Sequence, residues 1–492
     1  MSDSLKDRSG KGDGVAETLI TQADHWLDER TGIDSLLHEA LDEPIPGGAR
    51  WAYVFGSGLL FLFVSQIITG VCLSLYYVPS ADHAHTVASY IVKVVTAGSF
   101  IRSIHAYGSS GIIILLALHI GQTVLYGSYK GRRELLWLSG CILLALMLGM
   151  AFTGYLLPWD EKAYFATAVG TNLIAELPVV GPVLQRLVRG GSEMGTLTLS
   201  RFFVLHVFVL PAVLIGFIAG HVFFFRKAGA AGPIEEDPVA PKLPAVPFYP
   251  RQVAMDALFA VVIIGILAAI AHYVPMDLGP AANPADTHFL PRPEWYYRPA
   301  FQWLKYLSGR WSLMGGIMLP ALLALIFAAV PFLDRRPERR PWRRPVTVGA
   351  FTLFLVAYLS LGFASYHDDY SDPGMAAQMH KQDADAKAFM EQPFVPETAA
   401  GSATVSLVAA NPAVLKGQAL FEANSCSSCH GEGGVGSAAA GPLIGVAAKM
   451  DDSQLLALLH TPNAKMTAGG MQPVDLQSAD MEALTAYLRQ LK

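Results

Sequence analysis

Four histidines stand in two apolar segments at nearly equal spacing. His105 and His119 are 14 residues apart, and His206 and His221 are 15 residues apart. On an α-helix, such steps return to nearly the same face about 21–22 Å further along the axis. Two such helices side by side present two facing histidine pairs, one near each side of a hydrocarbon layer about 30 Å thick. This pattern predicts two stacked b-type haems, because ionisable groups inside membrane helices are costly and usually functional. Four hydrogen-bonded core histidines are the alternative.

Bis-histidine ligation would determine what these haems do. Two protein ligands saturate the iron, so the pattern predicts electron transfer rather than oxygen binding. Each ligand must be a neutral imidazole whose second ring nitrogen donates to a nearby acceptor. The sequence does not show which groups accept.

Four glycines repeat the histidine spacing in two further apolar segments. They are Gly56 and Gly70 in the first segment, and Gly140 and Gly154 in the second. A missing side chain lets a flat macrocycle approach the backbone, although close helix–helix packing also uses small residues. Arg102 and Arg133 are candidates for pairing with haem propionates, or they are interfacial anchors.

A second kind of haem site is predicted near the C-terminus. Cys426 and Cys429 lie in Cys-Ser-Ser-Cys-His, the pattern of covalent c-type haem attachment, with His430 as one axial ligand. The second axial ligand is expected to be a methionine. Met471, in Gly-Gly-Met-Gln-Pro, is our choice, with Met466 as the alternative. The remaining cysteines lie in apolar segments, so a disulfide framework is not expected.

The elements that must position these groups are membrane helices. Hydrophobic residues make up 52% of the 492 residues and charged residues only 15%. We expect an all-α polytopic membrane protein with a four-helix dihaem bundle and a small all-α cytochrome c domain. The seven apolar spans are expected at about 53–78, 104–126, 134–157, 201–226, 253–274, 312–333 and 346–366. The polar first eighteen residues argue against a cleavable signal peptide.

Basic loops set the expected orientation. Lysines and arginines gather in residues 127–133, 226–252 and 334–344, which share one side of the membrane. The positive-inside rule makes that side cytoplasmic. The N-terminus is then cytoplasmic as well, and the haem c motif lies outside, where bacteria attach haem c. We therefore expect a multi-pass protein of a bacterial inner membrane, with membrane lipid around it.

The domain boundaries follow from composition. Residues 19–43 predict an amphipathic helix on the membrane surface, or a solvated helix packed on the next domain. Residues 368–410, rich in Ala, Asp, Gln, Ser and Pro, predict a flexible tether. The expected parts are an N-terminal segment 1–50, a dihaem domain 51–228, a cytoplasmic linker 229–252, a three-helix domain 253–367, the tether 368–410 and a haem c domain 411–492.

Several motifs resemble one membrane protein family. These are Arg-Ser-Ile-His (102–105), Gly-Tyr-Leu-Leu-Pro-Trp-Asp (154–160), Leu-Ser-Arg-Phe-Phe-Val-Leu-His (199–206) and Pro-Arg-Pro-Glu-Trp-Tyr-Tyr (291–297). They closely resemble cytochrome b of the Rieske/cytochrome b quinol oxidase complexes, over about residues 20–366. The 15-residue histidine step and the seven spans look like the chloroplast type, with cytochrome b and its three-span partner subunit fused near 230–250. The C-terminal part resembles a small class I cytochrome c.

The resemblance implies partners for the histidines and two quinone sites. It pairs His105 with His206 near the outer face and His119 with His221 near the inner face. Pro293, Glu294, Trp295 and Tyr296 match the family's Pro-Glu-Trp-Tyr motif at the outer quinol site, although Arg292 departs from the commonest context. There Glu294 is implied as the acceptor of a quinol proton. Tyr296 belongs to the same motif, and Tyr164 is implied to line the pocket.

At the inner quinone site the resemblance implies Arg226 and Asp256, although Asp256 also suits an ordinary helix start. The chloroplast type carries a cysteine early in the first span that binds an extra haem. Val54 stands at that position here, which argues against the extra haem.

The resulting hypothesis is a quinol:cytochrome c oxidoreductase subunit that runs a Q-cycle. It would bind two non-covalent haem b, one covalent haem c and quinol, and pass electrons to a Rieske iron–sulfur protein. The haem c domain would relay the Rieske electron to a soluble cytochrome c or terminal oxidase, in a homodimeric complex. The alternatives are an electron-transfer subunit that binds quinone without bifurcation, and a non-catalytic haem redox sensor. Nothing predicts nucleic acid binding.

Overall fold

The fold was analysed in a computed structural model. It describes residues 21–22, 25–32, 41–234, 244–286, 288–396, 412–424, 426–431, 434, 443–446, 450–463, 466–467 and 471–491. Most of the surface helix predicted over 19–43 lies outside these ranges. Within it, residues 25–31 are helical and the side chains of Trp26 and Leu27 are exposed.

Seven described helices are long and apolar enough to cross a membrane, as predicted. They are Trp51–Ser74, Gly98–Tyr126, Glu134–Tyr155, Thr196–Ala228, Arg251–Tyr273, Gly309–Ala328 and Pro345–Ser371. Each is apolar over most of its length and carries few charged residues, because the hydrocarbon layer requires about 20 predominantly apolar residues and leaves no water for backbone groups.

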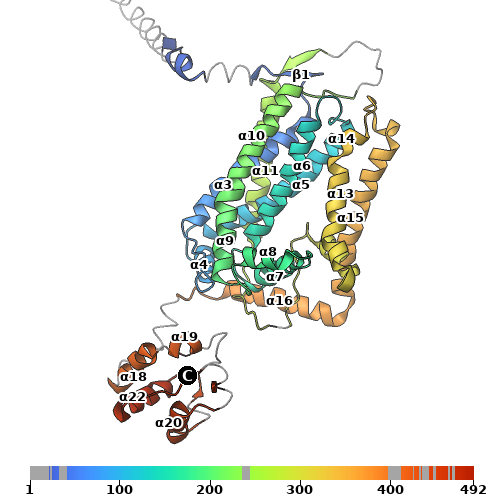
Figure 1. Cartoon of the computed structure of the whole chain (residues 1–492). Helices are drawn as coiled ribbons and strands as arrows, with labels where there is room; N and C mark the ends of the chain where they lie inside the picture. The colour runs from blue at the N-terminus through green and yellow to red at the C-terminus, as the bar shows by residue number, and fades with distance from the viewer. Residues whose placement is uncertain are drawn as a thin grey trace, which may run out of the picture. The chain divides into compact units, whose positions relative to one another are not determined.

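The first four spans form a bundle. In α3 (Val54–Ser74), α5 (Gly98–Tyr126) and α6 (Glu134–Tyr155) the helices are regular. The fourth span consists of α9 (Thr196–Val204), the π-helix η2 (Leu205–Val209) and α10 (Leu210–Ala228). Helix α3 packs along α5, and α6 packs along α10 (Figure 1).

Three later spans pack against this bundle. Helix α11 (Arg251–Tyr273) contacts both α3 and α5. Leu267 of α11 is buried with Leu62, Ile112 and Leu115 of those helices. The sixth span contains η3 (Gly309–Trp311), the π-helix η4 (Met314–Met318) and α13 (Leu319–Ala328), and α14 (Val330–Leu333) follows it. The 3₁₀ turn η5 (Pro341–Arg343) precedes the last span, α15 (Pro345–Ser371), which packs along the short helix α12 (Arg298–Tyr306).

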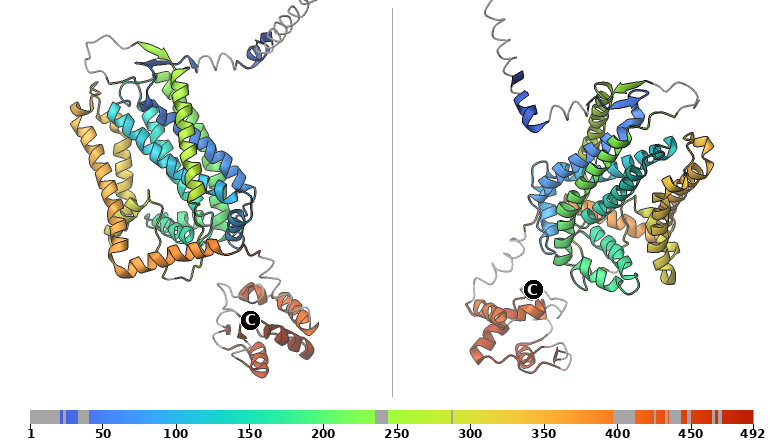
Figure 2. Two further views of the ribbon diagram at one scale, coloured as in Figure 1. Left: turned by 180° about the vertical axis from the view of Figure 1, so that it is seen from behind. Right: turned by 45° about the horizontal axis from the view of Figure 1, so that its top comes forward.

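The bundle has two distinct ends, visible in Figures 1 and 2. At the sheet end, β1 (Pro44–Pro46) pairs antiparallel with β2 (Ala245–Pro247), next to the 3₁₀ turn η1 (Trp51–Tyr53). This small sheet was not predicted, because proline-rich three-residue strands carry no periodic signal. At the α7 end lie the surface helices α4 (Ala84–Lys93), α7 (Glu161–Ala175), α8 (Gly181–Arg189) and α16 (Pro373–Glu391).

Helix α16 corrects the prediction of a flexible tether from residue 368. Helix α15 continues to Ser371, and the first compact unit of the chain ends only at Phe394. Asp372 caps α16 by accepting from the amide of Met375 at 2.8 Å, and Pro373 follows at the first helical position. The far end is held by Lys93, which donates to the Phe389 carbonyl at 2.6 Å. The polar composition resembled a linker because only one face of the helix is packed.

The second compact unit spans Val395–Lys492. Its described helices are α18 (Pro412–Ala423), α19 (Cys426–His430), α20 (Asp452–His460) and α22 (Ser478–Leu488). Helices α18 and α22 pack together around a core that includes Phe421, Met481 and Leu484. This is the small helical domain predicted at the C-terminus.

Candidate functional site

The histidines predicted as one pair, His105 and His206, face each other near the α7 end of the bundle. Helix α5 supplies His105 and the π-helix η2 supplies His206. Their ring centroids are 6.2 Å apart. Metal–imidazole bonds are about 2 Å long, so two rings on opposite sides of one metal ion have centroids about 6 Å apart. The spacing of this pair therefore fits bis-histidine ligation of a haem iron.

A hydroxyl group contacts the second ring nitrogen of three of the histidines. Thr69 Oγ1 lies 2.9 Å from Nδ1 of His105, and Ser139 Oγ lies 2.9 Å from Nδ1 of His221. For His206, the Met150 carbonyl lies 3.1 Å from Nδ1, with Thr153 Oγ1 at 3.3 Å. A carbonyl only accepts, so the proton of His206 sits on Nδ1 and its Nε2 is left with a lone pair for a metal.

The four predicted glycines each lie against one of the four histidines. A Cβ on Gly154 would lie 2.9 Å from Nε2 of His206. For the other three pairs the distance from the Cβ to the histidine Cε1 would be 3.1 Å for Gly70 and His105, 3.3 Å for Gly140 and His221, and 3.7 Å for Gly56 and His119. The glycines therefore keep open the space beside each imidazole, as a cradle for a flat group requires.

The hydroxyl residues could have been found from the sequence. Thr69, Ser139 and Thr153 each stand directly before one of the four glycines, in Thr-Gly or Ser-Gly pairs. Adjacent residues on a helix point about 100° apart, so one imidazole can touch the glycine backbone while its nitrogen meets the neighbouring hydroxyl.

The π-helix η2 explains the unequal histidine spacing. A π turn holds one residue more than an α turn. The extra residue lies within Leu205–Val209, which contains His206 itself. A 15-residue step through one π turn therefore keeps the register of a regular 14-residue step, and His221 faces the same direction as His206. His119 lies on α5, and its pairing with His221 stays a prediction.

The two predicted propionate partners donate to main-chain carbonyls in this structure. Arg102 binds the carbonyls of Met276 and Asp277 at 2.8 and 3.0 Å. Arg133 binds the carbonyls of Lys130, at 3.0 Å, and Ala228, at 3.1 Å. Both guanidiniums fix loops at the ends of the bundle, and no further role follows from these contacts.

The haem c motif opens the second unit. Cys426 and His430 lie at the two ends of α19, while the side chain of Cys429 lies outside the described part of the chain. Cys426 and Met471 both pack against the core of this unit. The Met471 amide donates to the Met466 carbonyl at 3.0 Å, so the two candidate methionines are neighbours. Met481 is buried in the core, as an ordinary core residue would be.

The Pro-Glu-Trp-Tyr motif is anchored among the spans next to α12. Trp295 donates to Ser110 Oγ at 3.2 Å, and Tyr297 donates to the Leu148 carbonyl at 2.6 Å. The Tyr296 ring is buried, and burial raises the pKa of its hydroxyl, which therefore stays protonated at neutral pH. These contacts hold the motif between α5 and α6.

Glu294 lies at the edge of this region with one ionic partner. Its carboxylate meets the Lys162 ammonium at 3.1 Å and is 26% exposed, so water reaches it. The Lys162 ammonium also lies 5.8 Å from the centroid of the Tyr155 ring, and the buried hydroxyl of Tyr155 has no hydrogen-bond partner among the described residues. Sequence reasoning missed Tyr155, although it lies inside the Gly-Tyr-Leu-Leu-Pro-Trp-Asp motif.

Tyr164 lies on the first turns of α7. Asp160 caps this helix by accepting from the Ala163 amide at 2.8 Å. The Tyr164 ring packs edge-on against Trp159, with centroids 5.3 Å apart. Among the described residues no hydrogen bond joins Tyr164 to Glu294, and a shared pocket stays a prediction.

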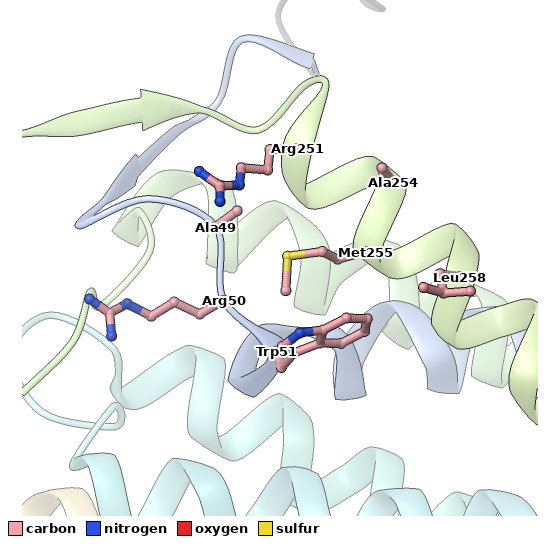
Figure 3. A pocket seen from close by; sticks show the side chains of 7 residues that line it. All are labelled: Ala49, Arg50, Trp51, Arg251, Ala254, Met255 and Leu258. Atoms are coloured by element: carbon pink, nitrogen blue, oxygen red, sulfur yellow. The ribbon is translucent and has the colours of Figure 1, made fainter.

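Asp256 and Arg226 lie near the sheet end. Asp256 accepts from Gln252 at 2.9 Å. Arg226 lies in the last turn of α10. A nearby open pocket of about 610 Å³ is lined by Ala49, Arg50, Trp51, Arg251, Ala254, Met255 and Leu258 (Figure 3). Its α11 residues lie about 100–160° from Asp256 around the helix, so the pocket and Asp256 use different faces.

The chain matches the models of known protein families. The family described as cytochrome b/b6/petB matches residues 40–229, and cytochrome b (C-terminal)/b6/petD matches residues 281–379. A cytochrome b of Rickettsia bellii is 32% identical over 74% of this chain and 89% of its own length. This chain belongs to the cytochrome b family. The cytochrome c family additionally matches residues 414–492. The resemblance noted from the motifs is thus confirmed, including the fused cytochrome c domain.

Other relatives align with part of this chain. A menaquinol:cytochrome c reductase cytochrome b subunit of Geobacillus thermodenitrificans is 38% identical over 44% of this chain and all of its own. A cytochrome b/c1 of Bradyrhizobium diazoefficiens is 33% identical over 69% of this chain, which spans about half of that relative's length, 49%. A solved hyperthermophilic respiratory complex III aligns with a TM-score of 0.62 at 27% identity, covering 74% of this chain and 96% of that one.

Family membership fixes the cofactor types. Cytochrome b and cytochrome c families bind b-type and c-type haem, so this chain is a membrane protein that carries both. The described geometry fits them: a facing histidine pair, glycine cradles and a Cys-Ser-Ser-Cys-His helix.

Proposed function

We propose that this chain is the cytochrome b/c subunit of a quinol:cytochrome c oxidoreductase. Quinol is oxidised at the α7 end, and one electron passes to a Rieske iron–sulfur protein while the other crosses the membrane to a quinone at the sheet end. Two quinol protons leave at the α7 end for each quinol oxidised. The names of the Geobacillus and complex III relatives support this assignment.

The observation that carries the proposal is the surroundings of Glu294. Its carboxylate is 26% exposed, so water reaches it, while the Tyr296 ring of the same motif is buried. The Tyr155 hydroxyl, which has no hydrogen-bond partner among the described residues, is a buried polar group that a bound ligand would satisfy. We propose that Tyr155 hydrogen-bonds one quinol oxygen, and that Glu294 accepts a quinol proton and releases it to water, with Lys162 steadying the carboxylate. Trp295 and Tyr296 shape the pocket, and Tyr164 lines its approach.

The haem ligands are proposed from the geometry above. His105 and His206 hold one haem b, and His119 and His221 hold the other, each through Nε2. When bound, these haems supply one-electron carriers of tuned potential. Arg102 and Arg133 are proposed only to hold the loops beside the propionates. In the C-terminal unit, Cys426 and Cys429 attach haem c, with His430 and Met471 as axial ligands.

At the sheet end we propose an inner quinone site that uses Asp256 and Arg226. Asp256 is partly exposed, so its carboxylate can take up a proton from water directly, while Gln252 holds it by a hydrogen bond. The α7 end is then the outer side of a bacterial inner membrane. The rest of the complex would comprise the Rieske protein, a soluble cytochrome c or terminal oxidase as acceptor, and a second copy of this chain in a homodimer.

Steady-state turnover tests this function. In purified membranes, Glu294→Gln removes the proton-accepting charge but keeps the volume of the side chain. We expect quinol-dependent cytochrome c reduction to fall about a hundredfold or more, the usual contribution of a positioned base, with haem spectra unchanged. Turnover near wild type would contradict Glu294 as the base and favour an electron-transfer subunit without bifurcation.

A further inference from the structure

A fully buried carboxylate lies beside the Pro-Glu-Trp-Tyr motif. Asp369, on the last turns of α15, has a side chain that is 0% exposed. Both of its oxygens accept from Arg292 Nε at 2.8 Å, and Arg292 Nη2 adds a third contact at 2.6 Å. Arg298 Nη1 completes the cluster at 2.8 Å. The two guanidiniums are themselves only 9% and 8% exposed.

The two arginines bracket Glu294 in the sequence. Arg292 precedes Glu294 by two residues, and Arg298 follows it by four. Arg298 also begins α12, whereas Arg292 ends the loop that leads into the motif. One carboxylate therefore holds the backbone on both sides of Glu294.

The same stripe of α15 makes three further contacts with this segment. The Tyr358 hydroxyl donates to the Tyr296 carbonyl at 2.5 Å. Gly362 lies beside Pro299, whose ring is 3.5 Å from the position of a Cβ at 362, and the Arg298 guanidinium stacks 4.1 Å above the Tyr366 ring. Tyr358, Gly362, Tyr366 and Asp369 are spaced four, four and three residues apart and so share one helix face.

The charge of the cluster argues for a role beyond stability. Two arginines and one aspartate leave a net charge of +1 in a site shielded from water. Buried ion pairs are often no more stabilising than well-packed apolar side chains, because desolvation offsets their attraction. Such pairs do provide a fixed geometry, because a bidentate guanidinium–carboxylate contact sets both the distance between the two groups and the relative orientation of their planes.

We propose that Asp369 is a positioning residue for the outer quinol site. It acts through Arg292 and Arg298, which hold the backbone around Glu294 at the place where the carboxylate meets the quinol. This inference rests on the proposed role of Glu294. It assigns the last membrane span, which is far from the motif in sequence, a direct part in setting the geometry of the site.

The neighbouring residue provides a matched control. Asp368 is on the same turn of α15, but its side chain is 39% exposed. It accepts from Gln302 at 2.7 Å and from Lys305 at 3.1 Å, both on α12 beyond the motif. Asp368→Asn therefore removes an equal charge from the same turn without touching the residues that bracket Glu294.

The experiment compares variants of the whole purified complex. Asp369→Asn keeps the shape of the side chain but leaves both guanidiniums without a counter-charge. The double variant Asp369→Asn/Arg298→Gln keeps the net charge of +1, so it guards against a simple failure to fold. Three quantities are measured: thermal stability, hydrogen exchange of the peptide covering 291–299, and the kcat and KM of quinol-dependent cytochrome c reduction.

A positioning role predicts a specific combination of results. In the double variant, thermal stability returns toward wild type, while exchange over 291–299 stays faster and kcat stays lower by about tenfold to a hundredfold, as expected for a misplaced catalytic group. Asp368→Asn should match wild type within about twofold in kcat, since exposed ion pairs contribute little. Wild-type exchange over 291–299 in both Asp369 variants would overturn the proposal, and so would recovery of kcat together with stability.

The exchange measurement also separates this proposal from the proposed function. If Glu294→Gln retains wild-type turnover, the assigned base is wrong. Faster exchange over 291–299 in the Asp369 variants would then still support the positioning role of Asp369. Exchange at the wild-type rate would refute that role.

Discussion

The imidazole of His206 lies directly against Gly154, so that a Cβ at position 154 would come within 2.9 Å of Nε2. That nitrogen is the one left free for a metal, because Nδ1 is taken by the Met150 carbonyl. A single methyl group at this glycine would therefore displace the proposed ligand atom itself.

Gly154→Ala should disturb the haem near the α7 end selectively. Overpacking in a tight site costs about 1–3 kcal/mol, and here the strain falls on the His206 ring. We expect the optical spectrum and midpoint potential of one b haem to change while the other stays as in wild type. Gly149→Ala is the control, because a Cβ there meets nothing within 4 Å. Equal effects of both substitutions would refute the close contact.

The π-helix makes a second, less obvious prediction. Deleting Phe208, whose side chain is 61% exposed, should convert η2 into a regular turn and leave His206 and His221 a regular 14 residues apart. Both b haems should then be retained. Deleting Ile113 from the regular helix α5 turns His119 by about 100° relative to His105, and haem should be lost. Haem quantification by pyridine haemochrome decides; loss of b haem in the Phe208 deletion would contradict the register argument.

The haem c domain offers a choice between two methionines. Met471→Ala should remove the axial sulfur, lower the haem c potential and change its spectrum, because a methionine ligand raises the potential of a c-type haem. Met466→Ala should leave both unchanged. The opposite result would assign Met466 as the ligand. If neither substitution changed the spectrum or the potential, both methionines would be excluded as axial ligands.

His85 predicts a pH dependence of stability. Its Nε2 donates to the Gly279 carbonyl at 2.8 Å and its ring packs on Phe389 of α16. Burial lowers the pKa of His85 below its ordinary value of about 6.5. The unfolded chain therefore binds the proton first, so stability is full above about pH 6.5 and falls as the pH drops below it.

Thermal unfolding at pH 7.5 and 5.5 measures this effect. His85→Gln keeps a donor for the same carbonyl but does not titrate, so its melting temperature should fall less than that of wild type over this range. An equal fall of the melting temperature in the wild type and in His85→Gln would show that His85 does not titrate between pH 7.5 and 5.5.

Much of the fold could be predicted from local sequence patterns. Contacts between residues far apart in the sequence could not be predicted. The seven spans were predictable because each is a long apolar run, and the four histidines because their spacing follows helix geometry. Helix α16 was misjudged because its packing partner, Lys93 on α4, lies nearly 300 residues away. The ion pairs of Asp369 were not predicted for the same reason, since 77 residues separate Asp369 from Arg292.

Electron bifurcation is the central claim, and an oxidant pulse tests it most directly. In the purified complex, quinol is added first and a pulse of ferricyanide is then added while haem b absorbance is followed. The account predicts that the oxidant transiently increases haem b reduction, because removing one quinol electron toward the Rieske protein forces the second onto the b haems. Glu294→Gln should abolish this increase. Oxidation of haem b by the pulse in the wild-type complex would contradict the account and leave a linear electron-transfer subunit.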